Sequence, residues 1–506
     1  MKLSLFPALG LLAASLIPTL SGADKMNVLI LYADDLGYGD LTTYQDNSKI
    51  PTPHLDQIAK EGTRFTDGHS SSGICTPSRY ALLTGRHHWR DFHGIVNAMG
   101  ASVFPSERLT LPEMMKQSGY DTACIGKWHL GWDWMAIHTG DATHAKQKKV
   151  WEHTDFDWSQ EIPGGPLAHG FDHYFGDSVI NFPPYCWIRD NKVVTVPDST
   201  LLPKNIKQKT KEGNWEVRPG PAMADWDFYQ VLPTLADEGE KYLRGRKGQD
   251  KPFFLFFPFP SPHAPIIPTD EFDGKSGAGA YGDFVVQTDD IVGRLIKALK
   301  ESGEYENTII IFSADNGPEH YAYARDEKFG HWSAEPFRGL KRDIYEGGHH
   351  VPFLIKWPGK TEAGSVEDAL VSQIDIMATL ANYLDFSLPE DAAEDSHDLL
   401  PLLDGTVEKV RDSHIHNTAK GKYAIRVGDW LYIDQPSGNH NGRKALAFEK
   451  RRNYPEDDQK VALYNLKEDI AQRHNLAAKN PEKVAEMKAE MKKIRDQGFS
   501  APRLKK

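Results

Sequence analysis

The sequence predicts an α/β fold, a mostly parallel sheet flanked by helices, and three observations support it. Continuous apolar runs occur at residues 26–32, 253–257 and 308–312. Such runs, unlike alternating ones, are typical of strands buried on both faces of a parallel sheet. Helical patterns lie between the runs, and strands that alternate with helices indicate a doubly wound sheet. At 506 residues the chain is also long enough to bury a large core.

The helices are predicted from their boundary signals. Residues 54–60 follow a Pro-Thr-Pro turn, and Thr110 precedes Glu113 with the spacing of a capping box. Gly119 stands where that helix should end, because glycine readily adopts the left-handed conformation that follows many helices. Residues 284–299 form a long amphipathic pattern with helical periodicity.

The pattern changes after about Leu384. An acidic, loop-like stretch is followed by two short strands around a Gly-Asp turn, and then by a charged terminal helix. These segments are residues 389–397, residues 423–427 with 430–433, and residues 480–497. We therefore expect a main domain over residues 24–403. A smaller α+β subdomain, with a small antiparallel sheet and a terminal helix, is expected over residues 404–506.

The N-terminus predicts export from the cytoplasm. A positive residue, Lys2, precedes a largely apolar stretch over residues 3–20, and small residues end it at Ala23. This order is typical of a secretory signal peptide over residues 1–23, removed to give a periplasmic or secreted protein. A membrane anchor is the alternative, but prolines and a glycine break the stretch. No later run is long enough to span a bilayer, so we expect no stable membrane insertion.

Charge and cysteine content exclude two further classes of protein. The formal net charge is −12, whereas a nucleic-acid partner would require a basic face. An acidic protein can still hold an anionic substrate in a local cationic pocket. The three cysteines, Cys75, Cys124 and Cys186, are too few for a disulfide scaffold, and their odd number leaves a thiol unpaired or modified. Cys124 lies in an apolar run and is interpreted as a core residue.

Polar clusters follow the apolar runs of the predicted sheet. Asp34 and Asp35 follow the first run, Asp315 and Asn316 follow residues 308–312, and further clusters follow residues 253–257 and 122–125. Ligands of open α/β sheets bind outside the carboxyl ends of the strands, so we expect these clusters to meet at one edge. Three carboxylates and an amide favour a hard cation such as Ca²⁺ over Zn²⁺. The alternative is that the acidic pairs merely cap loops.

Cys75 is predicted to begin a helix. Pro77 suits a first helical turn, and Arg79 follows one turn after the cysteine. The N-terminus of a helix favours anions, and Arg79 would add a fork-shaped cation. The alternatives are an ordinary helix start with a surface arginine, or a reactive thiol of low pKa.

These residues carry a resemblance to a known family. The segment Cys75-Thr-Pro-Ser-Arg79, followed by Tyr80-Ala-Leu-Leu-Thr-Gly85, resembles the signature of the type I, formylglycine-dependent sulfatases. Other motifs of the family occur in the family's order at residues 33–40, 126–131, 262–265, 313–317, 338–341, 345–348 and 351–352. The joint pattern is specific, although each short piece alone is weak. The resemblance implies an alkaline-phosphatase-like fold and makes residues 24–403 the catalytic domain.

The resemblance also implies a hydrolase of sulfate esters and a role for each motif. Cys75 would be oxidised to formylglycine by a maturation enzyme, and its hydrate would attack sulfur and later release sulfate. Calcium would be held by Asp34, Asp35, Asp315, Asn316 and residue 75. Arg79 would orient residue 75, Lys127 and Lys341 would neutralise sulfate oxygens, His129 would assist sulfate release and His263 would protonate the leaving group.

A sulfated carbohydrate is the predicted substrate. Export, the basic segment 443–452 and aromatic residues in predicted loops favour it, with plain loop packing as the alternative for the rings. These aromatic residues are Trp132, Trp134, Phe182, Tyr185 and Trp187. A phosphomonoester or phosphodiester hydrolase of the same fold is one rival, and an inactive carbohydrate-binding homologue is another. The sequence assigns no role to His87, His88 or Asn181.

Overall fold

The computed structural model describes residues 25–140 and 150–502. The predicted signal peptide, residues 1–23, lies outside the described residues. The largest sheet has ten strands in the order β13-β2-β12-β11-β1-β10-β4-β5-β6-β7. Its central strands, all parallel to one another, are β11 (Thr308–Ala314), β1 (Asn27–Asp34), β10 (Phe253–Pro262), β4 (Asp121–Ile125) and β5 (His173–Gly176). The predicted mostly parallel α/β sheet is confirmed.

Shorter strands complete the sheets. On one side of the large sheet lie β12 (Phe353–Lys356), β2 (Thr63–Phe65) and β13 (Ser365–Glu367), and on the other β6 (Ile188–Arg189) and β7 (Lys192–Val193). Two separate ribbons pair β14 (Val371–Ser372) with β3 (Gly68–His69), and β8 (Ser199–Leu201) with β9 (Gly220–Ala222). Antiparallel pairing of β12 and β6 with the central strands makes the sheet mixed at both flanks.

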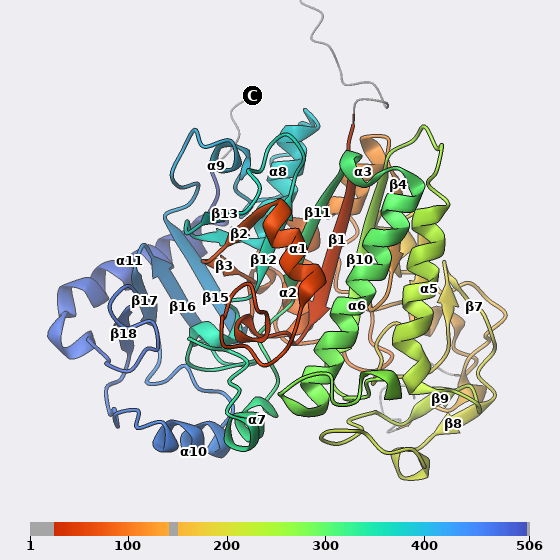
Figure 1. Ribbon diagram of the computed structural model, residues 1–506, viewed down its shortest axis with the longest axis horizontal. Coiled ribbons are helices and arrows are strands. Elements are labelled where there is room, and N and C mark those ends of the chain that lie inside the picture. The colour runs from red at the N-terminus through yellow and green to blue at the C-terminus, as the bar shows by residue number, and fades with distance from the viewer. Residues whose placement is uncertain (1–24, 141–149, 503–506) are drawn as a thin grey trace, which may run out of the picture.

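Both faces of the central strands are covered by helices, which explains why their sequences are apolar without alternation. From β1, Leu29 and Leu31 enter a core shared with α1 (Pro53–Glu61), α5 (Val231–Arg244) and α6 (Gly279–Ser302). Val28 and Ile30 enter the opposite core, shared with α2 (Cys75–Thr84), α3 (Leu111–Gln117) and α8 (Ile376–Tyr383). Figure 1 shows α5 and α6 side by side across one face of the sheet.

The boundary signals of the predicted helices are confirmed. In α3 the Thr110 side chain accepts a hydrogen bond from the Glu113 backbone, and Glu113 accepts one from the Thr110 backbone. Gly119 follows the helix with a positive φ of 91°. The predicted helix at residues 284–299 lies within α6, which is longer than expected by a turn or more at its N-terminus.

The C-terminal part forms a second, antiparallel sheet, coloured blue in Figure 1. Its strands are β15 (Ser413–Ala419), β16 (Lys422–Val427), β17 (Trp430–Ile433) and β18 (Ala462–Asn465), each paired with the next. The predicted pair is confirmed as β16 and β17, and the predicted terminal helix is α11 (Pro481–Gln497), which packs on this sheet. The other α-helices of the described residues are α7 (Ala322–Phe329), α9 (Leu400–Leu403) and α10 (Arg443–Arg451).

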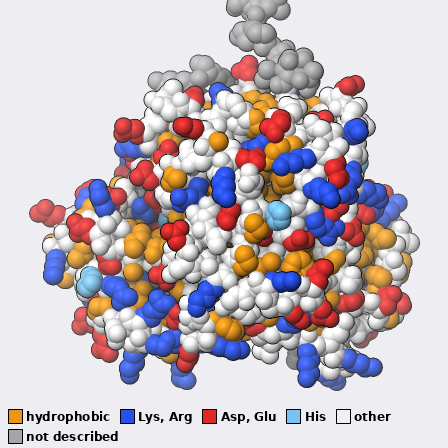
Figure 2. All heavy atoms as spheres, viewed as in Figure 1, with side chains coloured by type: hydrophobic (Ala, Val, Ile, Leu, Met, Phe, Trp, Pro, Cys, Tyr) orange, Lys and Arg blue, Asp and Glu red, His pale blue; other side chains and the backbone are white. Residues whose placement is uncertain are grey.

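The surface is mixed in charge. Figure 2 shows lysine and arginine side chains interspersed with aspartate and glutamate over the face drawn. Across the part of the chain that the structure describes, no helix is long and apolar enough to cross a membrane.

Candidate active site

The ends of β1 and β11 bring two polar pairs together, as the sequence predicts. Asp34 ends β1, and Asp35 follows with a left-handed φ of 63°. The Asp35 backbone amide donates to Asp315 Oδ1 at 3.2 Å, and Asn316 Nδ2 donates to Asp35 Oδ1 at 2.7 Å. All four side chains are fully buried. They therefore form one cluster at the carboxyl edge of the sheet.

This cluster suits a hard divalent cation. Asp34 Oδ1 and Asn316 Oδ1 are buried oxygens without a hydrogen-bond partner in the described residues. Ligand atoms of Asp34, Asp35, Cys75 and His263 all lie within 4.8 Å of one another. Buried oxygens that lack donors are costly unless a cation takes the donor's place. The site thus offers oxygen ligands beside residue 75.

Cys75 is the first residue of α2, and its thiol is almost fully buried. Burial raises the pKa of the Cys75 thiol to about 11, although Lys341 and Lys127 act in the opposite direction. The thiol is therefore protonated near neutral pH, which argues against the alternative of a reactive cysteine of low pKa. As a thiol, residue 75 is a poor nucleophile.

Arg79 holds two parts of the site in place. Its Nε and Nη2 atoms donate to Asp315 Oδ2 at 3.0 and 2.8 Å, and Nη1 donates to the Lys127 carbonyl at 2.9 Å. The guanidinium is fully buried, so the alternative of a surface arginine is wrong. A forked, always charged side chain is well suited to fix a carboxylate and a loop at once.

Two buried lysines balance the carboxylates. Lys127 forms an ion pair with Asp34, and Lys341 Nζ lies 2.7 Å from Asp35 Oδ1. Burial lowers the pKa of Lys341, but Asp35 and other negative groups outweigh it, so the pKa is raised and the amine stays cationic. Burial and the charge of Asp34 raise the pKa of Asp315 to about 7, because clustered carboxylates repel one another.

The two predicted catalytic histidines lie at the same edge. His129 Nε2 lies 3.0 Å from the Val96 carbonyl, which can only accept, so Nε2 carries the proton and Nδ1 keeps its lone pair. His263 Nε2 lies 3.7 Å from Asp35 Oδ2. Burial is the main cause that lowers the pKa of both rings. The positive charge of Lys127 lowers the pKa of His129 further, and that of Lys341 does the same for His263. His129 is thus a neutral imidazole near neutral pH.

A glycine places the segment that carries Lys127 and His129. Gly126, directly after β4, has a φ of 133°, and its backbone amide donates to the Phe175 carbonyl. A Cβ atom at this position would lie 2.1 Å from the Pro258 carbonyl oxygen. Only glycine permits this approach of β4 to β10, which directs Lys127 toward Asp34.

Sequence reasoning missed two acidic residues near the site. Asp177 follows β5, is buried, and has no hydrogen bond to its carboxylate within the described residues; burial raises its pKa to about 7. Glu319 Oε2 lies 3.6 Å from Lys341 Nζ and 2.7 Å from Arg342 Nη2. Asp177 stands at a strand end like the residues that were predicted, so its position was an available signal.

Three residues without an assigned role have structural surroundings. Asn181 Nδ2 donates to the Glu216 carbonyl at 3.3 Å. His87 and His88 are fully buried, and burial lowers the pKa of each to about 3. His88 pairs with Asn417 of β15 at 3.2 Å, so these histidines pack against the second sheet.

The aromatic residues of the predicted loops follow the packing alternative. Four of the five rings are buried, and Trp187 is partly buried against the core. Trp132, for example, packs on Trp134 and Tyr174, with its indole nitrogen donating to Ser178. Large apolar rings gain more from core packing than from solvent-exposed loops, so the packing alternative prevails.

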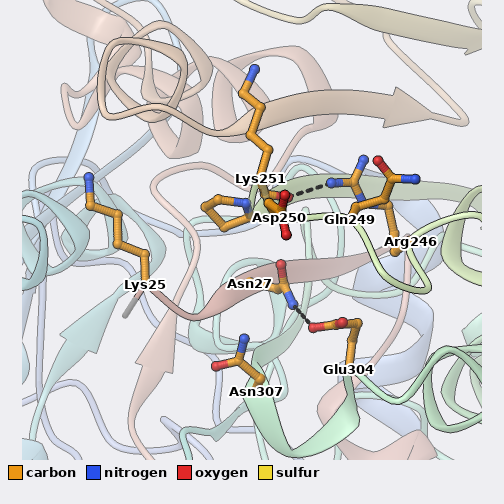
Figure 3. A pocket seen from close by; sticks show the side chains of 9 residues that line it. Lys25, Asn27, Arg246, Gln249, Asp250, Lys251, Glu304 and Asn307 are labelled. Atoms are coloured by element: carbon orange, nitrogen blue, oxygen red, sulfur yellow. Dashed lines mark hydrogen bonds between the residues drawn. The ribbon is translucent and has the colours of Figure 1, made fainter. Parts of the chain in front are cut away.

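A cavity of about 410 Å³ lies at the other edge of the sheet. It is lined by Lys25 and Asn27 before and at the start of β1, and by Arg246, Lys251 and Glu304. Figure 3 shows Asn27 donating to Glu304, at 2.9 Å. Because this cavity adjoins the amino ends of the parallel strands, it is separate from the cluster around Cys75.

Two family models match the chain. The sulfatase model matches residues 26–386, and the model described as N-sulphoglucosamine sulphohydrolase, C-terminal, matches residues 339–497. The first spans the large sheet and every predicted site residue, and the second spans the antiparallel sheet and α11.

Similar proteins match this chain over most of their length. The N-acetylgalactosamine-6-O-sulfatase of Bacteroides thetaiotaomicron is 31% identical over 488 residues, with 92% of each chain covered. Human arylsulfatase A is 30% identical over 481 residues, with 92% of this chain and 86% of that protein covered. A solved structure concerned with the metabolism of multiple glycosaminoglycans by Bacteroides thetaiotaomicron has a TM-score of 0.78 and 28% identity, and covers 93% of this chain and 99% of that one.

Proposed function

This chain is a sulfuric ester hydrolase of the sulfatase family, and we propose that it desulfates a sulfated carbohydrate with a formylglycine made from Cys75. The observation that supports this most is the convergence of buried oxygens, two lysines and Cys75 at one sheet edge. A sulfate ester needs positive charge around its oxygens, an in-line nucleophile and a proton for the leaving group.

The proposed metal is one Ca²⁺ ion held by Asp34, Asp35, Asp315, Asn316 and residue 75. When bound, it would supply Lewis-acid stabilisation of negative charge and a template for the sulfate group. The unpartnered oxygens of Asp34 and Asn316 support this assignment. The protein's own contribution is to fix the donors, through Arg79 on Asp315 and the Asn316 amide on Asp35.

Residue 75 is the proposed nucleophile after maturation. Formylglycine would supply a hydrated aldehyde, with one hydroxyl to attack sulfur and a second to expel sulfate afterward. Burial raises the pKa of the Cys75 thiol to about 11, which disfavours the thiolate and supports the need for this modification. The start of α2 directs backbone amides at the same region, which favours an anion there.

The remaining side chains would stabilise negative charge and transfer protons. Lys127 and Lys341 would face sulfate oxygens, and each is paired with a carboxylate. His129, with a free lone pair on Nδ1, would accept a proton during sulfate release. His263 lies at the rim of the site and is 8% exposed; burial and Lys341 lower its pKa, so it would have to gain a proton when the substrate is bound in order to donate one to the leaving oxygen.

The relatives support a sugar sulfate as substrate. Because the aromatic rings are buried, this proposal now depends on the similar proteins, several of which are N-acetylgalactosamine-6-sulfatases. A 6-O-sulfated N-acetylgalactosamine is therefore the first compound to assay. We also propose that the protein is exported and that a maturation enzyme acts on Cys75. The proposed boundary between the catalytic domain and the C-terminal subdomain lies between residues 403 and 404.

The test compares sulfate and phosphate esters of one leaving group, and then 6-O-sulfated N-acetylgalactosamine. We expect kcat/KM for sulfate to exceed that for phosphate, and the sulfated sugar to be hydrolysed by the wild type but not by Cys75→Ala. Faster phosphate hydrolysis would favour the phosphohydrolase alternative. Sugar binding without turnover, in protein whose residue 75 is matured, would favour the inactive homologue.

A further inference from the structure

A second cluster of metal-ligand residues lies apart from the oxygen cluster. It comprises His69 in β3, His349 directly after the short helix Glu346–Gly348, and His416 in β15. Their side chains are buried, and one ring nitrogen from each lies within 4.8 Å of the others. The three residues come from distant parts of the sequence and join the large domain to the antiparallel sheet.

Hydrogen bonds fix the tautomers of two of these rings. His69 Nε2 lies 2.7 Å from Asp67 Oδ1, a carboxylate that also pairs with Arg426 at 3.0 Å. His349 Nε2 lies 3.2 Å from the Ile344 carbonyl oxygen. Both oxygens can only accept, so both Nε2 atoms carry the proton. In each neutral ring the lone pair is therefore on Nδ1.

These two lone pairs face each other. His69 Nδ1 and His349 Nδ1 are 3.2 Å apart, a distance at which two acceptors repel unless a cation lies between them. A shared proton would create a buried imidazolium, and burial lowers the pKa of both rings. A metal ion meets the same need, since nitrogens of a tetrahedral zinc site, with bonds of about 2.0–2.1 Å, lie roughly 3.3 Å apart.

His416 offers the third ligand. Its ring stacks on His349 with centroids 3.5 Å apart, and neither of its nitrogens has a hydrogen-bond partner in the described chain. No hydrogen bond within the described chain therefore holds this ring in the stack, and one of its nitrogens lies within 4.8 Å of a ring nitrogen of His69 and of His349. A buried imidazole with two unpaired nitrogens is costly unless it gains a partner.

Two neighbouring histidines do not fit the ligand set. His350 uses both nitrogens, at 2.9 Å from Glu346 Oε2 and 2.8 Å from the Thr66 carbonyl. His414 Nδ1 accepts from Arg411 Nη1 at 3.0 Å, so its Nε2 carries the proton. His414 lies two residues from His416 in the same strand and is equally buried, which makes it a matched control.

We propose that His69, His349 and His416 bind a divalent transition-metal ion, with Zn²⁺ as the expected metal. Imidazole ligands favour such ions over Ca²⁺. The Asp67 carboxylate and the Ile344 carbonyl would orient the ligating rings, as acceptors behind metal-bound histidines do. The ion would join β3, the loop after Gly348 and β15, and so fasten the two sheets together.

The test uses the full chain, purified with Ca²⁺ present and then supplied with Zn²⁺ or Co²⁺. We expect about one equivalent of Zn²⁺ per chain by elemental analysis, and a visible Co²⁺ absorption band typical of tetrahedral nitrogen ligation. His416→Gln should lower bound Zn²⁺ at least tenfold, whereas His414→Gln should retain it. Zn²⁺ should raise the Tm of the wild type and of His414→Gln but not that of His416→Gln.

Two outcomes would overturn the proposal. One is a wild-type protein that binds no Zn²⁺ or Co²⁺ after removal of surface-bound metal. The other is equal Zn²⁺ uptake by His416→Gln and the wild type. The Co²⁺ spectrum of the wild type decides the question even if a variant fails to fold, and it does not depend on whether the chain cleaves sulfate esters.

Discussion

Each cation at the site has a carboxylate partner in contact, and this pairing determines what single substitutions do. Lys341 pairs with Asp35, and Arg79 pairs with Asp315, in both cases away from water. Removal of one partner from a buried pair leaves the other charge uncompensated, which costs about 3–5 kcal/mol. Substitutions here therefore affect stability as well as catalysis, and each needs a control.

Lys341→Ala is expected to lower kcat/KM for a sulfate ester by roughly 10²–10³-fold, because it removes positive charge from the region of the sulfate oxygens. Steady-state kinetics on folded protein measures this loss. Lys356, at the end of β12, is a comparably buried lysine whose amine donates to the carbonyl of Tyr305 and lies outside the site. Lys356→Ala should therefore retain kcat/KM. Equal losses in both variants would show that Lys341 acts only through stability.

Asn316→Ala is expected to weaken Ca²⁺ binding by at least about tenfold, or about 1.4 kcal/mol, because it removes one of the unpartnered oxygens. Calorimetric titration of chelator-treated protein with Ca²⁺ measures the affinity. Asn382→Ala, at an exposed asparagine paired with Asp398, is the control and should bind Ca²⁺ like the wild type. Unchanged affinity in Asn316→Ala would remove Asn316 from the ligand set.

Residues in short motifs were predictable from the sequence, and residues that depend on distant contacts were not. Asp34, Asp35, Asp315 and Asn316 each follow an apolar run, so local order alone placed them at one edge. The contact between the Nδ1 atoms of His69 and His349 joins residues that are 280 positions apart in the sequence, and no local pattern encodes it. The choice between sugar stacking and packing for the aromatic residues was open for the same reason, since burial is set by the whole fold.

At the scale of elements, the strength of the hydrophobic signal decided what was predictable. The apolar strands β1 and β11 and the capped helix α3 were predicted close to their bounds, whereas β10 continues beyond the predicted residues 253–257 to Pro262. The short strands β6 to β9 were not predicted, because two- and three-residue strands carry no measurable periodicity. β6 pairs with β5 and β7 with β6, whereas β8 and β9 pair with each other in a separate sheet.

The turn after β4 gives a prediction at this scale. Gly126→Ala places a Cβ against the Pro258 carbonyl, so it should displace Lys127 and lower kcat/KM by more than about tenfold, or about 1.4 kcal/mol. Gly119→Ala is the control, since Gly119 also has a positive φ, of 91°, but no atom lies within 4 Å of the added Cβ. It should lose about 1 kcal/mol of stability and keep its activity. Full activity in Gly126→Ala would contradict the account of this turn.

At the scale of the whole molecule, a buried ion pair links the catalytic part to the C-terminal helix. Arg90 Nη2 lies 2.7 Å from Asp395 Oδ1, and the Ser500 hydroxyl, just after α11, donates to the same carboxylate. Burial raises the pKa of Asp395, but His87 and Arg90 outweigh it, so the pKa lies well below its ordinary value of 3.8. A carboxylate with a lowered pKa stabilises the fold above its ordinary pKa and loses this effect as the pH falls.

Asp395→Asn should therefore lower the free energy of unfolding near neutral pH by about 3–5 kcal/mol, and the Tm should fall with it. The difference in Tm between variant and wild type should narrow as the pH falls below about 4, because the Asp395 carboxylate of the unfolded wild type then binds a proton that the folded carboxylate, with its lowered pKa, does not yet bind. Thermal unfolding from pH 7 to pH 3 measures both effects. Asp412→Asn, at an exposed carboxylate paired with Lys409, should show neither. A difference that stays constant with pH would contradict the ion-pair account.

The central claim is that residue 75, once modified, is the nucleophile of a metal-assisted site formed at the carboxyl edge of the sheet. The most direct measurement plots the rate of sulfate release against the fraction of chains whose residue 75 carries an aldehyde, determined by mass spectrometry of the same preparations. The account predicts a straight line through the origin. Turnover by chains that retain the Cys75 thiol, or a rate independent of that fraction, would contradict it.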